Sequence, residues 1–571
     1  MARRYRTKVL KFILTICVFC GVFFLKTVRT PIELVNPSIL PQIKDPLKKS
    51  WYDVKEIPHG PGEQGLPFYL PSGFEKFKHE LYKENGFNAL VSDFISLNRT
   101  LPDIRHPSCK TKLYLSILPK VSLVIPFHNE HWSTLLRTVT SVLNRSPVQI
   151  IQEIILVDDF STKAQLKAPL DSFVKKHSSI IHVIRAKKRE GLIRARLLGA
   201  KKAVGDILVF LDSHTEVNID WLPPLIEPIA INRKTVACPF IDVIDYETLA
   251  YRAQDEGARG SFDWELYYKR LPLLPEDLKH PADPFKSPVM AGGLFAIDRM
   301  FFWNLGGYDK GLDVWGGEQY ELSFKIWQCG GQMFDVPCSR VGHIYRKFAP
   351  FPNPGLGDFV GRNYKRVAEV WMDEYKEYLY LRRPHYRKID AGNLTDQKSL
   401  RKTLQCKPFR WFIEKVAYDQ PKKYPPIEPP DYAKGEIRSV AVDLCIDTKF
   451  RKQNERFGLD ACIKDNPNIR GEQQFVLSWH KDIRPIKRNI CFDVSCSKKQ
   501  APIVLWNCHG MQGNQLWKYD LETQHLIHLL TNTCLDCDVQ KKQVFMNSCD
   551  STKRTQSWRF EIINSTAIFN W

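Results

Sequence analysis

The chain has 571 residues, of which 43% are hydrophobic and 26% are charged. This balance indicates globular domains and excludes a mainly disordered or fibrous protein, and the length exceeds that of one ordinary domain. The net charge of +20 would suit nucleic acid, anionic phosphates or a membrane face. The cations are not gathered in one tail and no zinc-finger or RNP pattern occurs, so we predict that nucleic acid is not a partner.

An apolar segment near the amino terminus predicts a membrane anchor. Residues 9–28 can span a bilayer if Lys11 and Lys26 extend toward its surfaces, and several basic residues without an acid precede them. A cleaved signal peptide is the alternative, but 26–29 lacks the small residues of a cleavage site. We expect a cytoplasmic tail at 1–8, a signal anchor, and a lumenal remainder, and the 15 cysteines agree with an oxidising compartment.

The following region passes from a stem into alternating strands and helices. Residues 29–104 are rich in proline, lysine and glutamate and predict a stem, and 105–425 predicts a globular domain. In that domain the apolar runs 123–125, 154–157 and 207–211 alternate with amphipathic stretches at 134–143 and 163–176. This order predicts a right-handed α/β sheet with buried parallel strands. Functional side chains are then expected beyond the carboxyl ends of the strands.

A proline-rich linker, predicted at 426–435, leads into a domain of three repeats at 436–571. Each repeat begins with a cysteine in an apolar run, has a second cysteine 15 to 17 residues later and ends near a tryptophan. The first cysteines are Cys445, Cys491 and Cys534, the second are Cys462, Cys508 and Cys549, and the tryptophans are Trp479, Trp517 and Trp558. The repeat predicts three small β units around one core. The spacing suits one local disulfide in each unit, but the pairing stays open.

Two strand ends in the α/β domain carry acidic residues. Asp158 and Asp159 follow one apolar run, where they suit the polar edge of a ligand. The alternative is that they cap a helix or a turn. Asp212 and His214 follow another run and face the same side because they are two residues apart in an extended chain. One divalent ion fits between them, and their mixed oxygen and nitrogen ligands favour Mn²⁺ over Ca²⁺.

Two later clusters add an aromatic ring, a carboxylate and cations. Trp315 offers a flat face to a sugar and Glu318 could orient or deprotonate a hydroxyl, although a solvated turn is the alternative. His343 suits a third metal ligand and Arg346 suits a diphosphate, although such residues are more often structural. Residues 351–357 predict a mobile loop. Together the clusters predict a metal-assisted transferase that uses a phosphate-bearing donor.

Several long motifs in one order carry a family resemblance. They are PFHNEHWSTLLRTV from Pro126, EIILVDDFS from Glu153, FLDSH from Phe210, WGGEQYELSFKIWQCGG from Trp315 and CSRVGHIYRK from Cys338. With these motifs the chain resembles the polypeptide N-acetylgalactosaminyltransferase family over nearly its whole length. The motifs at Pro126 and Trp315 are most similar to the branch that prefers acceptors already carrying GalNAc.

The resemblance implies a fold, a reaction and a location. The fold is an A-type, Rossmann-like glycosyltransferase domain followed by a ricin-type β-trefoil lectin domain. The reaction is transfer of GalNAc from UDP-GalNAc to Ser/Thr hydroxyls of peptides or glycopeptides, with retention at the anomeric carbon, in mucin-type O-glycosylation. Retention is explained by attack on the same face, in which the leaving phosphate takes the hydroxyl proton. The location is the Golgi membrane, as a single-pass type II protein with lumenal domains.

The resemblance also implies roles for individual residues. The Mn²⁺ ligands would be Asp212, His214 and His343, the substrate contacts Asp159, Arg189, Asp212, Gly293, Trp315 and Arg346, and the catalytic centre Glu318 and Trp315, with Glu318 as a positioning residue. The chain departs from many family members at Pro126, Gln319 and Phe351. Phe351 lacks a hydroxyl expected near the nucleotide, which predicts a loss of about 1 kcal/mol in donor binding.

In the lectin domain the resemblance places the sugar site in the second repeat, at Asp493, His509 and Asn514. The first and third repeats are not expected to bind sugar, and the alternative is that all three are structural. The implied disulfides are Cys109–Cys338, Cys329–Cys406, Cys445–Cys462, Cys491–Cys508 and Cys534–Cys549. Cys238, Cys496 and Cys537 are left unassigned, and Asn98, Asn393 and Asn564 head N-glycosylation sequons.

Two other functions stay open at this stage. One is a Golgi-anchored GalNAc-binding lectin whose transferase domain is weak or inactive, for which Phe351 leaves room. The other is a transferase for a different UDP-sugar, which Gly292, Gly293 and Trp315 do not exclude. The complete set of implied metal ligands favours an active enzyme.

Overall fold

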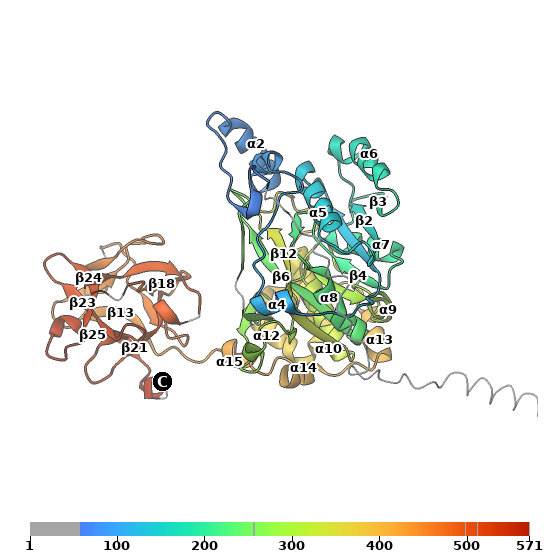
Figure 1. The fold of residues 1–571 in the computed structure, drawn as a ribbon. Helices are drawn as coiled ribbons and strands as arrows, with labels where there is room; N and C mark the ends of the chain where they lie inside the picture. The colour runs from blue at the N-terminus through green and yellow to red at the C-terminus, as the bar shows by residue number, and fades with distance from the viewer. Residues whose placement is uncertain are drawn as a thin grey trace, which may run out of the picture. The chain divides into compact units, whose positions relative to one another are not determined.

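The computed structural model describes residues 58–254, 257–466, 468–496, 498, 500–510 and 512–569 (Figure 1). The chain divides into two units, Met1–Tyr424 and Pro425–Trp571, and the boundary falls just before the predicted linker at 426–435. The predicted anchor lies outside the described residues. Within the part of the chain that is described, no helix has the length and apolar character needed to cross a membrane.

A mixed sheet of ten strands lies at the centre of the first unit (Figure 1). Along its main path the strands are β10 (Phe285–Lys286), β12 (Gln332–Ile344), β6 (Thr235–Ile244), β11 (Phe295–Asp298), β4 (Ile207–Phe210), β1 (Val121–Phe127), β2 (Ile151–Asp158) and β3 (Ile181–Arg185). Two short strands, β5 (Thr215–Val217) and β7 (Tyr251–Arg252), pair with β12 and β6. The predicted parallel arrangement is confirmed for β4, β1, β2 and β3. The other half is mixed, because β11 runs antiparallel to both of its neighbours.

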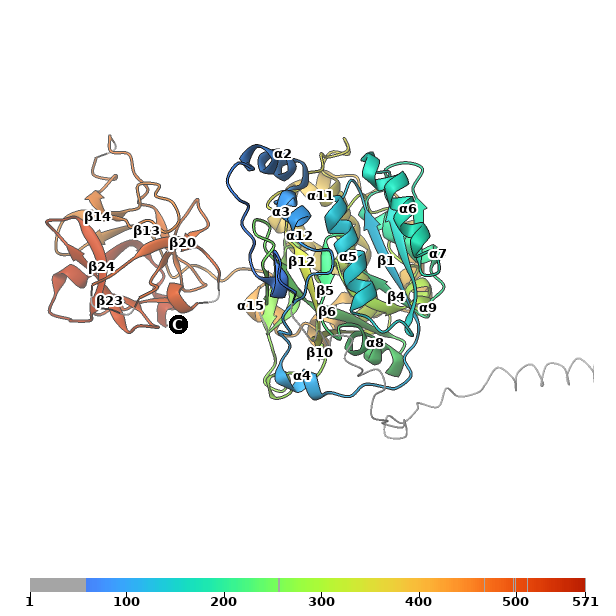
Figure 2. The same ribbon diagram turned by 45° about the horizontal axis from the view of Figure 1, so that its top comes forward.

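Helices cover both faces of this sheet (Figure 2). One face carries α5 (Trp132–Asn144), α6 (Ala168–Lys176) and α8 (Leu222–Ile231), and the other carries α7 (Leu192–Lys202), α9 (Arg299–Asn304), α10 (Glu318–Gln328) and α11 (Phe359–Trp371). Leu123 and Ile125 of β1 pack into the hydrophobic core beneath α5, α6 and α8, and Val124 packs into the core on the opposite face of the sheet. Burial on both faces explains why the predicted strands are apolar at every position.

Further elements complete the first unit. The hairpin of β8 (Ala258–Phe262) and β9 (Tyr268–Pro272) forms a separate two-stranded sheet. After α11 come α12 (Lys376–Arg382), α13 (Thr395–Thr403), α14 (Phe409–Lys415) and α15 (Gln420–Lys423). Aromatic side chains of α14 join the core that contains α10, so the unit continues to the predicted end of the domain.

Residues 58–104 belong to the first unit, so the predicted stem is wrong for them. They contain α2 (Glu75–Asn85) and α3 (Ala89–Phe94), and α4 (Pro107–Thr111) follows. Phe87 and Ile95 pack against Ile244 and Ile344, at the ends of β6 and β12. These partners are distant in sequence and the helices are short, so local periodicity could not reveal the packing.

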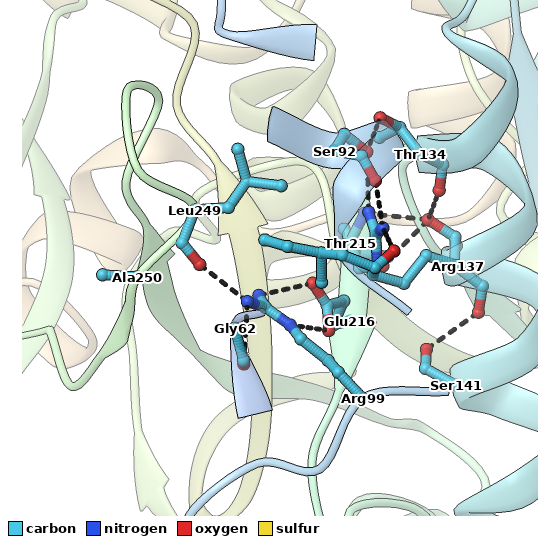
Figure 3. A network of polar contacts seen from close by, with 12 residues as sticks. Gly62, Ser92, Arg99, Thr134, Arg137, Ser141, Thr215, Glu216, Leu249 and Ala250 are labelled. Carbon is cyan, nitrogen blue, oxygen red and sulfur yellow. Dashed lines mark hydrogen bonds and ion pairs between the residues drawn. The ribbon is translucent and has the colours of Figure 1, made fainter. Parts of the chain in front are cut away.

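A buried polar network joins this segment to the sheet (Figure 3). Arg99 donates to both carboxylate oxygens of Glu216 at 2.7 and 2.9 Å and to the Leu249 carbonyl at 2.8 Å. Arg137 of α5 donates to the hydroxyl and the carbonyl of Ser92 at 2.7 and 2.6 Å. Glu216 lies in β5, two residues after the predicted metal ligand His214, so the segment supports the strand next to the site.

The second unit consists of short strands arranged in three similar repeats. They are β13 (Ala433–Ser439), β14 (Leu444–Asp447), β15 (Gly458–Ala461), β16 (Phe475–Leu477), β17 (Ile483–Pro485), β18 (Ile490–Asp493), β19 (Ala501–Pro502), β20 (Val504–Asn507), β21 (Trp517–Tyr519), β22 (Leu526–His528), β23 (Thr533–Asp538), β24 (Gln543–Ser548) and β25 (Trp558–Ile563), before α16 (Ser565–Phe569). In each repeat a hairpin begins one residue before the first cysteine and ends just before the second. β13 begins three residues before the predicted domain start.

One hydrogen-bond pattern recurs in all three repeats. Gln473, Gln515 and Gln556 donate to Asp447, Asp493 and Asp536 at 3.1, 3.0 and 3.0 Å. Two residues after each glutamine stands a buried aromatic ring, namely Phe475, Trp517 or Trp558. The first repeat ends near Trp479, but Phe475 fills the place that Trp517 and Trp558 take in the other two repeats, and Trp479 stacks on His480 instead.

The five implied disulfides are present, two in the first unit and one in each repeat of the second. Cys238, Cys496 and Cys537 are free thiols in the described structure. Burial raises the pKa of Cys238 well above its ordinary value, so this thiol is unreactive at neutral pH.

Candidate active site and sugar site

A cavity of about 270 Å³ opens at the carboxyl ends of β1, β2 and β4. Its lining includes five predicted site residues, which are Asp159, Arg189, Asp212, His214 and Trp315. Trp315 is 50% exposed there, so its ring is open to a ligand. Ligands of α/β sheets bind at this edge, and the location agrees with the sequence prediction.

Asp212, His214 and His343 lie together beside this cavity, with potential ligand atoms within 4.8 Å of one another. Asp212 follows β4, and His214 precedes β5, whose first residue pairs with His343 in β12. The Nε2 of His343 is 3.3 Å from the Oδ2 of Asp212, and the two imidazole rings are 4.7 Å apart. One carboxylate and two imidazoles at this spacing fit a divalent transition-metal ion.

Glu130 received no role from the sequence, yet its buried carboxylate organises this cluster. It accepts hydrogen bonds from Ser213 at 2.8 Å, from Nδ1 of His214 at 2.9 Å and from Arg346 at 2.7 Å. Burial raises the pKa of Glu130, but Arg346 and His214 outweigh it and hold the pKa well below its ordinary value. Because the ionised carboxylate only accepts, Nδ1 of His214 carries the proton and Nε2 is left for a metal.

Substitution of this carboxylate is expected to weaken metal binding. Glu130→Gln should lower the Mn²⁺ affinity roughly 10- to 100-fold, since partners of metal ligands have effects of that size. Electron paramagnetic resonance of free Mn²⁺ measures the affinity directly. The matched control is Glu153→Gln at the amino end of β2, a buried carboxylate that accepts from Ser122 at 2.7 Å. Equal affinities of the two variants would contradict the assigned role.

Arg196 of α7 was also missed, and its side chain is fully buried. It donates to Asp212 at 2.9 Å and to the Gly292 carbonyl at 3.1 Å, and it lies 3.7 Å from a carboxylate oxygen of Glu318. Burial raises the pKa of Asp212, but the hydrogen bond from His343 and the charge of Arg196 outweigh it and keep the pKa far below its ordinary value. Arg196 therefore lies between the carboxylates of Asp212 and Glu318 and fixes their positions relative to each other.

Glu318 is the first residue of α10 and follows Gly316 and Gly317, whose φ angles of 91° and 90° favour glycine. Its carboxylate is buried, and Oε2 has no hydrogen-bond partner among the described residues. Burial raises the pKa of Glu318. A Cβ atom at Gly293 would lie 2.7 Å from a carboxylate oxygen of Asp212, so a side chain there would displace Asp212. The unpaired oxygen suits a substrate hydroxyl.

Asp159 fixes the loop that precedes α7. It accepts from the backbone N–H groups of Glu190 and Gly191 at 2.7 and 2.9 Å and forms an ion pair with Arg189. Asp158 instead accepts from a backbone N–H in the turn after β2, at 2.7 Å. Each of the two roles predicted for this motif therefore belongs to one residue. Asp159 lines the cavity, and Asp158 caps a turn.

Arg346 lies beside the metal cluster rather than in the cavity lining. Its guanidinium donates to Glu130 and to the Asn85 carbonyl, and it lies 5.2 Å from the centre of the Phe87 ring and 5.7 Å from that of Phe351. Asn85 and Phe87, which lie in the predicted stem, thus hold the side chain of Arg346, the residue predicted to bind the diphosphate. Phe351 lines the cavity and is 40% exposed.

Restoring a hydroxyl at this ring is expected to improve donor binding. Phe351→Tyr should lower the KM for the nucleotide-sugar about fivefold, which corresponds to one hydrogen bond of about 1 kcal/mol. Steady-state kinetics at saturating acceptor measures this change. Phe348→Tyr is the matched control, because Phe348 has similar exposure but does not line the cavity. A donor KM that Phe351→Tyr leaves unchanged would show that this ring does not face the nucleotide.

The three lectin repeats differ in the number of hydrogen bonds that their equivalent aspartates, Asp447, Asp493 and Asp536, accept from the protein. Asp447 accepts three hydrogen bonds, from two backbone N–H groups and Gln473. Asp536 also accepts three, from one backbone N–H, Asn547 and Gln556. Within the described residues Asp493 accepts only one, from Gln515 at 3.0 Å. Among the described residues, Asp493 therefore keeps the most acceptor capacity of the three for sugar hydroxyls.

The neighbours of Asp493 agree with a site in the second repeat. Gln515 also accepts from the backbone N–H of His509 at 3.2 Å, and Asn514 precedes it in the chain. The equivalent positions to His509 are Ile463 and Asp550, whose N–H groups bond the corresponding glutamines at 2.8 and 2.9 Å. Isoleucine offers no polar side-chain atom there, so the first repeat lacks the group that the second presents.

Family models match both units of the chain. The model described as "Glycosyl transferase family 2" matches residues 122–306, and "N-terminal domain of galactosyltransferase" matches 277–348. "Ricin-type beta-trefoil lectin domain" matches residues 433–558. With the α/β sheet and the cluster at its carboxyl edge, these matches define a glycosyltransferase joined to a ricin-type lectin domain.

Similar proteins narrow this class. Polypeptide N-acetylgalactosaminyltransferase 10 from Homo sapiens is 53% identical over 91% of this chain and 87% of its own length, and N-acetylgalactosaminyltransferase 6 from Drosophila melanogaster is 51% identical over 92% and 80%. The chain belongs to the polypeptide N-acetylgalactosaminyltransferase family. A crystal structure of GalNAc-T7 with UDP, GalNAc and Mn²⁺ is 40% identical, covers 89% of this chain and 93% of its own, and has a TM-score of 0.63.

Proposed function

We propose that this enzyme transfers GalNAc from UDP-GalNAc to Ser/Thr hydroxyls of peptides and glycopeptides, with retention of the anomeric configuration, in mucin-type O-glycosylation. The observation that carries the proposal is the cluster of Asp212, His214 and His343 beside a cavity that also contains Asp159 and Arg189. The related GalNAc-T7 structure, which holds UDP, GalNAc and Mn²⁺, supports the choice of donor and ion.

The residues present fit Mn²⁺. Asp212, His214 and His343 would hold the ion, while Glu130 and Arg196 would orient its ligands through the bonds described above. When bound, Mn²⁺ supplies positive charge that stabilises the departing diphosphate. Arg189 and Arg346 would add to this charge from the nucleotide side.

Two residues would position the acceptor and the sugar. The unpaired Oε2 of Glu318 would accept a hydrogen bond from a substrate hydroxyl, and its burial excludes water that would compete for it. The exposed ring of Trp315 would cover an apolar face of the sugar. No carboxylate is thereby required as a nucleophile, in keeping with same-face attack.

The second lectin repeat would bind GalNAc already attached to an acceptor. His509→Ala should reduce the affinity for free GalNAc at least roughly tenfold, because a lost hydrogen bond to sugar is worth about 1.4 kcal/mol. Isothermal titration of GalNAc measures this effect, and activity on a short naked peptide should stay unchanged. Asp550→Ala, at the equivalent position of the third repeat, is the control. A loss of affinity in both variants alike would contradict a site in the second repeat.

A preference for GalNAc-bearing acceptors follows from the motifs at Pro126 and Trp315. The test offers the full chain, with UDP-GalNAc and Mn²⁺, a naked Ser/Thr peptide and its GalNAc-bearing twin, and counts added sugars by mass spectrometry. We expect addition to the glycopeptide at a higher rate. Faster addition to the naked peptide would contradict the branch assignment, and no addition to either, with GalNAc binding retained, would favour an anchored lectin.

We further propose a type II protein of the Golgi membrane, anchored by residues 9–28 with both domains in the lumen. The five disulfides support an oxidising compartment. Immunofluorescence should place the full chain in the Golgi, and glycosidase digestion of its N-glycans should show a lumenal domain. A diffuse cytosolic signal without N-glycans would contradict this location.

A further inference from the structure

A second hollow in the lectin domain, of about 640 Å³, lies apart from the proposed sugar residues. It is lined by hairpin turns from all three repeats, within 447–459, 500–502 and 538–545. We call it the hairpin cavity. Its floor is apolar, with buried Phe457, Leu459 and Val544. Its volume lies in the range of ligand pockets.

The acidic residues of the hairpin cavity are occupied by the protein itself. Asp447 accepts the three hydrogen bonds described above. Glu455 accepts from the N–H of Lys452 at 2.7 Å, and Asp538 accepts from the N–H groups of Gln540 and Lys541 at 3.0 and 2.9 Å. These carboxylates stabilise turns, and with three of them against five Lys and Arg side chains the lining keeps an excess of two positive charges.

The lysine and arginine side chains of the hairpin cavity form few ion pairs with the protein. Lys449 pairs with Asp460 at 2.6 Å, and Lys541 lies 3.7 Å from Asp538. Arg451, Arg456 and Lys542 are exposed, and within the described residues none of them forms an ion pair. Three unpaired cations around one hollow attract an anionic ligand.

Backbone conformation at these turns adds a second observation. Lys449, Gln500 and Lys542 all have left-handed backbone, with φ angles of 47°, 59° and 52°. Glycine is favoured at such positions because it adopts them without strain. Two of the three positions carry a lysine instead, and both lysines line the cavity. The turns therefore present cations where the backbone alone would prefer no side chain.

We propose that the hairpin cavity binds acidic stretches of acceptor polypeptides, at a site separate from the sugar site. The identity of the ligand as an acceptor rests on the proposed function. A polypeptide is favoured over a uniformly sulfated glycan because the lining mixes cations with fixed carboxylates. Asp and Glu side chains of a peptide would pair with Arg451, Arg456 and Lys542, while uncharged residues between them could lie beside the carboxylates, which would repel a uniformly charged chain of sulfates.

The test measures binding by fluorescence anisotropy with the full chain. The probe is a labelled peptide of alternating glutamate and glycine without Ser or Thr, and its twin has glutamine for glutamate. The variant Arg451→Gln/Arg456→Gln/Lys542→Gln is compared with Lys434→Gln/Lys487→Gln/Lys553→Gln, which removes three exposed cations outside the cavity. We expect the first variant to bind the acidic probe roughly tenfold more weakly, since each exposed pair contributes a fraction of a kcal/mol.

The binding of the two probes to the parent and to the two variants tests whether the hairpin cavity is the acidic-peptide site. Selective loss in the cavity variant, with a control within twofold of the parent protein, supports the proposal. Equal loss in both variants, equal binding of both probes, or binding of a heparin-derived oligosaccharide without binding of the acidic peptide overturns it. In a parallel assay, acidic flanks on a Ser/Thr acceptor should raise kcat/KM in the parent and in the control variant but not in the cavity variant. Absence of transfer to every acceptor, with acidic-probe binding intact, would contradict the proposed function and still support the anionic site.

Discussion

Asp212→Asn is expected to reduce transfer of GalNAc by roughly 1,000-fold or more in kcat/KM, an effect of about 4 kcal/mol on the barrier. The side chain keeps its shape but loses the negative charge that would hold the metal between His214 and His343. Mn²⁺ affinity should fall in parallel, which electron paramagnetic resonance measures without turnover. Arg196 loses its closest carboxylate, so a moderate loss of stability is also expected.

The control for this variant is a carboxylate at the opposite end of the same strand pair. Asp298 pairs with Arg233 at 2.8 Å and caps α9, and its register partner is Ile207 at the start of β4. Asp298→Asn should lower the melting temperature but leave Mn²⁺ affinity unchanged. If Asp212→Asn retains more than a tenth of the activity while folded, the assigned metal cluster is wrong.

Arg99→Ala is expected to reduce the free energy of unfolding by about 3–5 kcal/mol, since it leaves a buried carboxylate without its partner. The side chains of Arg99 and Glu216 are 0% and 4% exposed. Burial raises the pKa of Glu216, but Arg99 and Arg137 outweigh it and lower the pKa below its ordinary value. This contribution is therefore present at neutral pH and is lost as the pH falls through the lowered pKa. Chemical denaturation at neutral and acidic pH measures both effects.

Two further variants test the physical reason. Arg99→Met/Glu216→Leu removes both charges and should recover at least half of the loss, because no buried charge is then left unpaired. Lys78→Ala breaks an exposed ion pair with Glu247 and should change stability by less than about 1 kcal/mol. A loss in Lys78→Ala as large as that in Arg99→Ala would show that the buried pair has no special weight.

The sequence predicted those site residues that stand beyond strongly apolar strands. Asp159 and Asp212 follow β2 and β4, whose residues are buried on both faces, so strand, end point and side-chain direction could all be inferred. The disulfides were implied only through family resemblance, because spacing alone does not fix pairing. The three repeats could be predicted from their cysteines and tryptophans, but the buried position of Phe475 in the first repeat could not.

The residues that escaped prediction act through distant partners. Arg196 lies in helical sequence without a distinctive pattern, and Glu130 lies within the motif at Pro126 but was given no role there. Their roles appear only when β5, β12 and α7 meet. The sequence predicts a stem over residues 58–104 because the region is rich in proline, lysine and glutamate and its periodicity is weak. Their contribution depends on contacts such as Asn85 with Arg346, which no local pattern can show.

Mass spectrometry of a Ser/Thr glycopeptide after incubation with UDP-GalNAc, with and without Mn²⁺, tests the central claim most directly. We expect that each transfer adds the mass of one GalNAc, that chelation of the metal prevents transfer, and that nuclear magnetic resonance shows an α-linkage, as in the donor. Addition that persists in Asp212→Asn without metal, or an inverted linkage, would contradict the central claim.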